Sequence, residues 1–112
     1  MLFRKIFTTE AMIKALNISP EKAEQTFQSR LGRDPWLTPF TALRLTELPK
    51  EGIKKLLVAC PAFVSDCLET LEEIAERGKE IFMNAGGENY EMIPCMNTQP
   101  VWVNAVKEII AK

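Results

Sequence analysis

The residues best suited to chemistry form an acidic series in the second half of the chain. Glu69, Glu73, Glu76 and Glu80 recur at steps of four, three and four residues, which places them along one face of a helix. The chain has no histidine, so site chemistry must rest on carboxylates, hydroxyls or thiols. Like charges four residues apart repel mildly, so the series is either a solvated face, with Glu73 paired to Arg77, or an acidic face neutralised by cations.

The start of this acidic helix offers a second interpretation of Glu69. The segment Asp66-Cys67-Leu68-Glu69 has the spacing of a capping box, in which the first side chain accepts from the third helical N–H and the glutamate reaches back. Spacing alone favours that capping role. Cys67 has no neighbouring base to activate its thiol, so we do not expect it to act as a nucleophile.

Trp36 is the aromatic residue whose position could serve a ligand. It lies in the loop Arg33-Asp34-Pro35-Trp36-Leu37. A tryptophan there either packs as an anchor under its own loop or lines the cleft of a flat aromatic ligand. Spacing does not choose between these two roles.

Length and composition predict one compact domain over all 112 residues, of which 46% are apolar. Fourteen basic and fifteen acidic residues leave a net charge of -1, so we expect no nucleic-acid partner. The longest apolar run, Leu56–Cys60, is too short for a transmembrane segment, and Met1–Phe7 lacks the pattern of a signal peptide, so we expect a cytoplasmic protein. Cys60, Cys67 and Cys95 form no even set and no CxxC pair, which predicts reduced thiols.

The elements that must position these residues alternate along the chain. Apolar spacing predicts helices over residues 8–16, 40–48, 68–82 and 102–110, the last docked on the domain. Short apolar runs predict strands over residues 25–29, 56–60 and 90–94, the second of them covered on both faces. This order predicts an α/β fold, a parallel sheet with right-handed crossovers and helices on both faces. Ligands of such sheets bind at the carboxyl ends of the strands, here residues 29–36, 61–69 and 94–98.

Several motifs occur together in one order. They are Gln28-Ser29-Arg30, Gly32, Pro35-Trp36-Leu37, Gly52-Ile53-Lys54-Lys55-Leu56-Leu57-Val58, Phe63-Val64-Ser65-Asp66-Cys67-Leu68-Glu69-Thr70-Leu71, Gly78-Lys79-Glu80-Ile81-Phe82 and Ile93-Pro94-Cys95-Met96-Asn97. From about Thr8 to the end, the chain resembles the C-terminal half of ferrochelatase, and it looks most similar to bacterial members. The resemblance implies a chelatase-like, Rossmann-like half of a ferrochelatase.

Ferrochelatases insert Fe²⁺ into protoporphyrin IX to make haem, which requires two pyrrole protons to be removed while the ring accepts the metal from one face. The resemblance implies that Glu69 is the catalytic general base and that Glu73 assists metal delivery. It further places Ser29 on the metal path, and Cys67, a soft ligand, where many members have histidine. Trp36 matches a residue of the porphyrin cleft. Fe²⁺ is then a substrate, and no tightly bound cofactor is expected.

Two departures from the family pattern qualify this expectation. The chain lacks the family's catalytic histidine, which lies in a Ser-Ala-His-Ser-Leu-Pro motif just upstream of the helix that corresponds to residues 8–16. It also lacks the N-terminal half and one central strand that would run beside residues 56–60. Leu2 to Phe7, or another subunit, could supply that strand. The cysteine-rich extension that carries an iron–sulfur cluster in some members is also missing, so no such cluster is expected.

These departures leave open whether the chain is a truncated protein, a split enzyme or a fragment, and we expect little or no metal insertion by the chain alone. The first alternative is a non-catalytic porphyrin- or metal-binding module that pairs with a separate N-terminal half. A second is a small chelatase acting as a symmetric homo-oligomer, which the lack of histidine disfavours.

Overall fold

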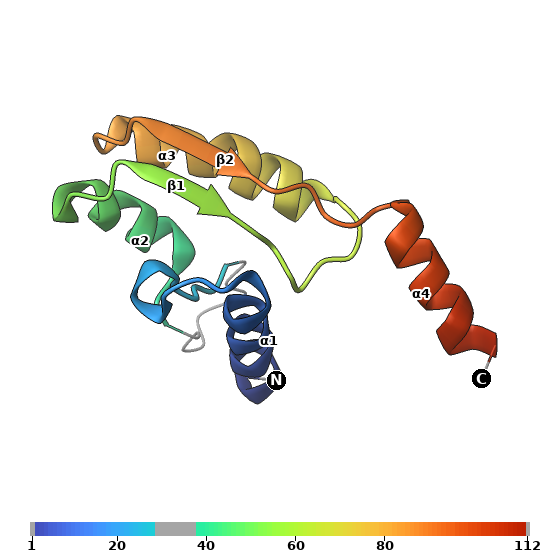
Figure 1. Cartoon of the computed structure of the whole chain (residues 1–112). Helices are drawn as coiled ribbons and strands as arrows, with labels where there is room; N and C mark the ends of the chain where they lie inside the picture. Colours follow the sequence, from blue (N-terminus) through green and yellow to red (C-terminus); the bar gives the residue numbers. More distant parts are fainter. Residues whose placement is uncertain (1, 29–37, 112) are drawn as a thin grey trace.

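The computed structural model describes residues 2–28 and 38–111, in which helices and 3₁₀ turns surround a pair of strands (Figure 1). In chain order they are α1 (Leu2–Leu16), the 3₁₀ turn η1 (Pro20–Lys22), α2 (Thr41–Glu47), the 3₁₀ turn η2 (Leu48–Glu51), β1 (Lys55–Val58), the π-helix η3 (Glu69–Gly78), α3 (Lys79–Asn84), β2 (Asn89–Met92) and α4 (Pro100–Ala111). The predicted α/β class is confirmed, with a parallel pair of strands as its sheet.

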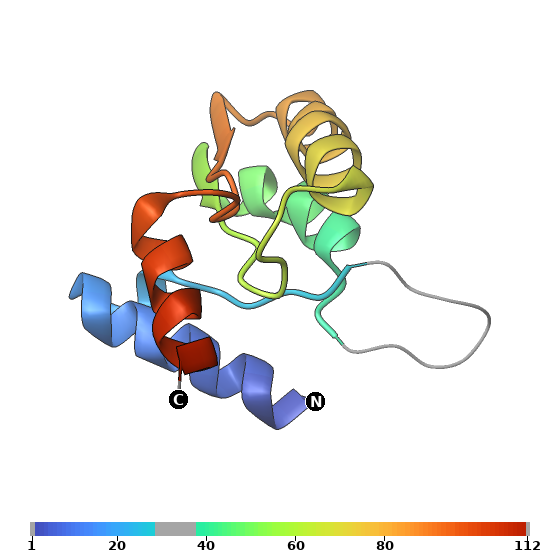
Figure 2. The same ribbon diagram turned by 90° about the vertical axis from the view of Figure 1, so that its right-hand side faces the viewer.

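The two strands form a βαβ unit with the helical crossover between them. β1 and β2 pair in parallel from Lys55 opposite Asn89 to Val58 opposite Met92, and the N–H of Ile93 extends the ladder to the carbonyl of Val58 (2.8 Å). Figure 2 shows η3 and α3 as one continuous helical rod beside the strands. The carboxyl ends of both strands therefore lie next to each other, at the edge where the sequence places a site.

The third predicted strand, over residues 25–29, is wrong for the part of it that the structure describes. Phe27 makes a single parallel bridge to Phe40, in which its N–H donates to the carbonyl of Pro39 (2.9 Å) and its carbonyl accepts from Thr41 (2.8 Å). The segment is thus bonded to the chain just before α2 rather than to the sheet. Phe27 is nevertheless buried, which accounts for the apolar signal in the sequence.

An ion-pair cluster also fastens this segment to α2. Arg44 contacts the carboxylates of Glu24 (2.9 Å), Glu47 (2.7 Å) and Glu51 (2.6 Å). Its guanidinium holds the pKa of Glu51 below the ordinary value of a glutamate. The ion pair between Arg44 and Glu24 holds the segment before residue 28 against α2, and residue 28 lies beside the candidate site.

The core lies between the crossover and β2, and its centre is Phe82, which is 0% exposed. Leu45 of α2 and Tyr90 of β2 pack with it. The buried positions of the crossover are Thr70, Ile74, Gly78 and Phe82, in steps of four. The α-helical spacing of the sequence predicts an apolar stripe of Leu68, Leu71, Ala75, Gly78 and Phe82, and the first half of that stripe is wrong.

The wrong half of the stripe consists of Leu68 and Leu71, which are 71% and 51% exposed. A π-helix closes i→i+5 bonds and has more residues in each turn than an α-helix, so four-residue steps stay on one face and three-residue steps leave it. The α-helical period used for the prediction does not apply between residues 69 and 78.

The strand β1 is less covered than its apolar sequence indicates. Leu56 and Val58 pack against the core, whereas Leu57, between them, is 63% exposed. The expectation that both faces of this run are buried is therefore wrong for Leu57.

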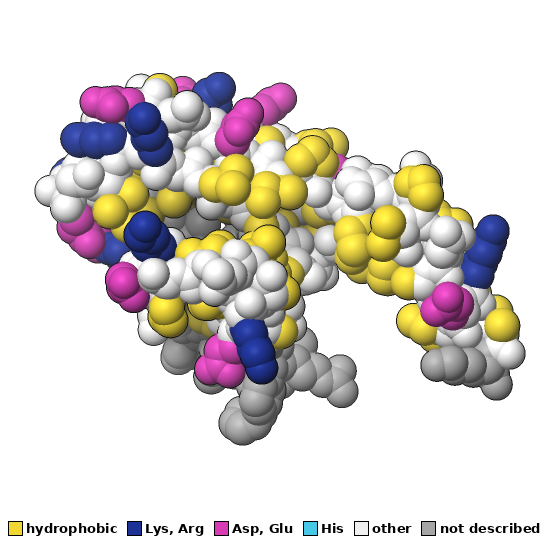
Figure 3. Space-filling view, viewed as in Figure 1, with side chains coloured by type: hydrophobic (Ala, Val, Ile, Leu, Met, Phe, Trp, Pro, Cys, Tyr) yellow, Lys and Arg dark blue, Asp and Glu magenta, His cyan; other side chains and the backbone are white. Residues whose placement is uncertain are grey.

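The terminal helices extend away from this core (Figure 1). α1 begins at Leu2, so the segment Leu2 to Phe7 is helical and does not supply the missing strand. The predicted terminal helix is confirmed as α4, but none of its residues is buried, and its docking on the domain is not observed. Hydrophobic side chains lie along its surface (Figure 3). Among residues 2–28 and 38–111, no helix is both long and apolar enough to cross a membrane.

Candidate functional site

Asp66 organises the edge where both strands end. Its carboxylate accepts hydrogen bonds from Asn97 Nδ2 (2.8 Å), the Thr70 hydroxyl (3.0 Å) and the backbone N–H of Cys95 (3.3 Å). Its own N–H donates to Asn97 Oδ1 (2.8 Å). These bonds, Asn97 first among them, hold the pKa of Asp66 below its ordinary value. The predicted meeting of residues 61–69 and 94–98 is thereby confirmed.

The first turn of the acidic helix is capped differently from the capping-box expectation. Leu68, the residue before η3, provides no side-chain cap, and Asp66 is engaged by the segment that follows β2. Thr70, which is 0% exposed, instead accepts from the N–H of Cys67 (2.9 Å) and donates to Asp66. The capping-box interpretation of Glu69 is therefore wrong, because the N–H of Asp66, to which the glutamate was expected to reach back, donates to Asn97 Oδ1 instead (2.8 Å).

Glu69 presents its carboxylate to solvent at the beginning of η3. The pKa of Glu69 is lowered, chiefly because the Cys67 side chain donates a hydrogen bond to it and also because its own backbone N–H does. Its backbone carbonyl accepts from Nε2 of Gln28 (3.2 Å), which ties the helix start to the segment after Phe27. An ionised, accessible carboxylate at the carboxyl edge of the sheet is an available proton acceptor.

The rest of the acidic series continues along the same helical rod. Glu73 is half-buried, while Glu76 and Glu80 are exposed. Arg77 forms an ion pair with Glu72 (2.6 Å), a residue outside the predicted series. The rod therefore presents several carboxylates to solvent beyond Glu69.

The predicted metal residues do not close into a site of their own. Within the described residues, no three cysteine, aspartate or glutamate side chains are grouped so that they could hold a metal ion. Glu73 and Cys67 lie on or beside η3, while Ser29 and Trp36 lie outside the described residues.

Cys60, Cys67 and Cys95 are free thiols in the structure, and Cys95 is buried. Burial raises the pKa of Cys60 to about 11, with smaller effects from Cys95 and Asp66. Burial and the hydrogen bond to Asp66 raise the pKa of Cys95 to about 11. Both thiols therefore stay protonated at neutral pH and act as hydrogen-bond donors or packing groups.

Sequence reasoning missed the roles of Asn97 and Thr70. Asn97 adopts φ 48, the left-handed conformation that asparagine tolerates better than most residues. The sequence could have indicated a role for Asn97, because this residue follows β2 at the same sheet edge as Asp66. Nothing in the sequence singles out Thr70, because a threonine inside an amphipathic helix is ordinarily expected on the polar, solvent-facing side.

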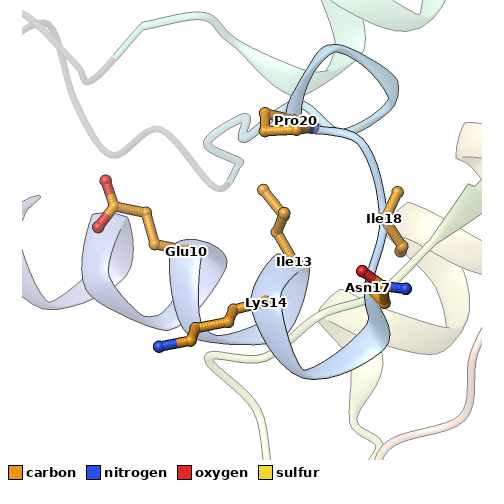
Figure 4. A pocket seen from close by; sticks show the side chains of 6 residues that line it. All are labelled: Glu10, Ile13, Lys14, Asn17, Ile18 and Pro20. Carbon is orange, nitrogen blue, oxygen red and sulfur yellow. The ribbon is translucent and has the colours of Figure 1, made fainter.

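A separate hollow of about 500 Å³ lies at the end of α1 and has no predicted site residue in its lining (Figure 4). It is lined by Glu10, Ile13, Lys14, Asn17, Ile18 and Pro20. All six come from one short stretch of chain, the last turns of α1 and the turn that follows. The hollow is therefore a local feature of that bend, and the candidate site remains the start of η3.

Comparison with known proteins gives one consistent result. The chain is 53% identical over 103 residues to the ferrochelatase of Cronobacter sakazakii, covering 92% of this chain and 32% of that protein. It is 52% identical over 100 residues to the ferrochelatase of Ectopseudomonas mendocina, covering 89% and 29%, and 50% identical over 105 residues to that of Pseudomonas putida KT2440, covering 94% and 31%. The chain thus spans about a third of the length of these relatives. Residues 6–112 match the family model described as ferrochelatase, and the chain belongs to the ferrochelatase family.

Proposed function

We propose that this chain is the part of a bacterial ferrochelatase that carries the acidic helix of the metallation site, and that the whole enzyme inserts Fe²⁺ into protoporphyrin IX in the cytoplasm. The observation that supports this most is the start of η3, where the ionised carboxylate of Glu69 is exposed at the carboxyl edge of the sheet. Fe²⁺ is the substrate in this proposal, and the site holds no iron–sulfur cluster.

In this mechanism Glu69 accepts protons from the pyrrole nitrogens. Its lowered pKa keeps the carboxylate ionised, and therefore free to take up a proton that then passes to the surrounding water. Cys67 helps to keep Glu69 ionised by donating a hydrogen bond to it. Glu73, one turn along η3, assists in bringing Fe²⁺ to the ring.

Two residues outside the described ranges complete the proposal. Ser29 contributes to the metal path, and Trp36 lines the porphyrin cleft. Ser29 directly follows Gln28, whose Nε2 donates to the Glu69 carbonyl (3.2 Å), and this contact supports the assignment of Ser29.

The partner of this chain is the remaining part of a ferrochelatase, about two-thirds of its length. That part would supply the catalytic histidine and a further strand. Exposed apolar residues on β1 and α4, Leu57 at 63% and Ile110 at 77%, support a covering partner. The isolated chain is accordingly expected to insert no metal.

Fluorescence of protoporphyrin, which changes on metal insertion, tests this proposal with Fe²⁺ or Zn²⁺. We expect no turnover by the chain alone and turnover when it is mixed with the remaining part of the Cronobacter sakazakii enzyme. Glu69→Gln should lower that rate by about 10²–10⁴-fold, because a positioned base contributes that much. Glu88→Gln removes the same charge from an exposed position outside η3 and should leave the rate unchanged. Equal rates for the two variants would contradict the assignment of Glu69.

The alternative is a porphyrin- or metal-binding module without catalysis, which the lack of histidine in this chain favours, because histidine is the commonest general base. This alternative predicts a shift of the Soret band when the chain alone is mixed with protoporphyrin, and loss of that shift in Trp36→Ala. It also predicts no metal insertion, either by the chain alone or by the chain mixed with the remaining part of the enzyme. Turnover in the mixed sample would rule this alternative out.

A further inference from the structure

Tyr90 of β2 places its hydroxyl against the backbone of the acidic helix. The side chain is 3% exposed, and its ring packs on Phe82 with centroids 5.7 Å apart. Its hydroxyl donates to the backbone carbonyl of Ile74 (2.7 Å). Ile74 directly follows Glu73 and is 2% exposed, so this bond fixes the peptide group between Ile74 and Ala75, one residue beyond the second glutamate of the acidic series.

Gly78 provides the space that lets the hydroxyl reach the helix. A Cβ atom at this position would lie 2.6 Å from the Tyr90 hydroxyl oxygen and 3.3 Å from Leu45 Cδ1. The glycine is therefore required here for space. Because Gly78 has no side chain, it leaves a slot on the helix surface, and the phenol group of Tyr90 occupies this slot.

The helix that receives this bond has an uncommon form. π-Helices are rare and usually short, whereas η3 runs over the ten residues Glu69–Gly78. Contacts from outside the helix must favour this form over the ordinary α-helix. Each residue of a π-helix turns through a smaller angle than in an α-helix, so rewinding would change the directions of Glu69 and Glu73 relative to each other.

We propose that Tyr90 is a positioning residue, which holds the π-helical turns of η3 through the Ile74 carbonyl and thereby sets the directions of Glu69 and Glu73. Burial raises the pKa of Tyr90 to about 12, so its hydroxyl remains a donor throughout the physiological pH range. The consequence for metal handling rests on the proposed function. The consequence for the helix does not.

Amide hydrogen exchange and backbone chemical shifts of the full chain test the effect on the helix. In Tyr90→Phe we expect exchange of the amides in residues 69–79 to rise about tenfold, because one buried hydrogen bond is lost. Amides of α2 should change much less. Thr46→Val is the matched control, since it removes a hydroxyl that donates to the Ala42 carbonyl (3.1 Å) within α2. Unchanged exchange in η3, or an equal rise in α2 and η3, would overturn the proposal.

Gly78→Ala tests the same contact from the other side. The added methyl group should displace the hydroxyl and reproduce the local change in residues 69–79. In the double variant Tyr90→Phe with Gly78→Ala, the oxygen that meets the Cβ is gone, so the combined loss of stability should be smaller than the sum of the single losses. Strictly additive losses would show that the two positions do not share a slot.

Titration with Co²⁺, followed by its visible absorption, separates this inference from the proposed function. If the chain binds Co²⁺ through η3, Glu73→Gln should weaken binding, and Tyr90→Phe should weaken it about tenfold at unchanged stoichiometry. Binding that Tyr90→Phe leaves unaltered would overturn the positioning role. No Co²⁺ binding by the unmodified chain would count against the metal step of the proposed function, and the exchange experiment would still decide the role of Tyr90.

Discussion

At the scale of single residues, the start of η3 depends on Asp66 more than on the glutamate that follows it. Asp66 joins the loop after β1 to the segment after β2 through Cys95 and Asn97, and Glu69 is left exposed and ionised. The spacing of the two acids fits a capping box equally well. What decides between these arrangements is Asn97, which lies 31 residues from Asp66 in sequence.

Asp66→Asn should destabilise the chain at neutral pH and have little effect in acid. An amide presents one acceptor atom where the carboxylate presents two, so the donors on Asn97, Cys95 and Thr70 lose a partner. The pKa of Asp66 lies below its ordinary value of 3.8 in the folded chain, so its stabilisation is present above about pH 5 and is lost as pH falls through the folded pKa.

Thermal unfolding checks this prediction. We expect the midpoint of Asp66→Asn to fall by about 4–8 °C at pH 7 and to approach that of the unmodified chain near pH 2. Glu88→Gln, at an exposed position, should not shift the midpoint at pH 7. A difference between Asp66→Asn and the unmodified chain that persists in acid would mean that shape, rather than charge, accounts for the role of Asp66.

At the scale of elements, the sequence was most informative where one local period held from end to end. The strands at residues 55–58 and 89–92 lie within two residues of their predicted bounds. The chain turns after α3 at Gly86, whose φ of 113° suits a glycine. The prediction failed where tertiary contacts override local preference. Tyr90 and Gly78 support a π-helix that no local pattern announces. The sequence likewise predicted a strand around Phe27 from its apolar character. Phe27 is buried, but its backbone hydrogen bonds go to residues beside α2 rather than to the sheet.

The buried stripe predicted from the sequence, which includes Leu71, and the stripe observed in the structure, which includes Ile74, make opposite predictions for one pair of substitutions. The structure buries Ile74 at 2% exposure and leaves Leu71 at 51%. Ile74→Ala should therefore lower the free energy of unfolding by about 2–5 kcal/mol, and Leu71→Ala by less than about 1 kcal/mol.

Urea unfolding of both variants measures this difference. Similar losses for Ile74→Ala and Leu71→Ala, or a larger loss for Leu71→Ala, would mean that the crossover follows the α-helical period that the sequence first indicates. The slope of the transition should stay the same in both variants, since neither change alters how much surface unfolding exposes.

At the scale of the whole molecule, the chain leaves apolar surface uncovered on two of its elements. Leu57 of β1 is 63% exposed, and Val101, Ile109 and Ile110 of α4 are 83%, 67% and 77% exposed. Figure 3 shows such side chains along α4 and over the neighbouring elements. A chain that spans about a third of its relatives has this surface available for the rest of a ferrochelatase to cover.

Ile110→Lys separates the stability of the chain from its association with that remaining part. Because Ile110 touches little within the chain, the substitution should change the free energy of unfolding by no more than about 0.5 kcal/mol. A charge placed in an apolar interface, by contrast, should weaken the complex with the remaining part of the Cronobacter sakazakii enzyme by at least about tenfold. Sedimentation or sizing of the mixed proteins measures the complex.

Asn104→Lys adds the same charge to an exposed polar position of α4 and should leave the complex intact. The comparison matters because a lysine anywhere on α4 changes solubility and the net charge equally. If both variants associate as the unmodified chain does, α4 is not part of the interface, and Leu57 on the open strand becomes the position to substitute next. If Ile110→Lys unfolds the chain on its own, α4 docks within the chain after all, as its apolar spacing first predicted.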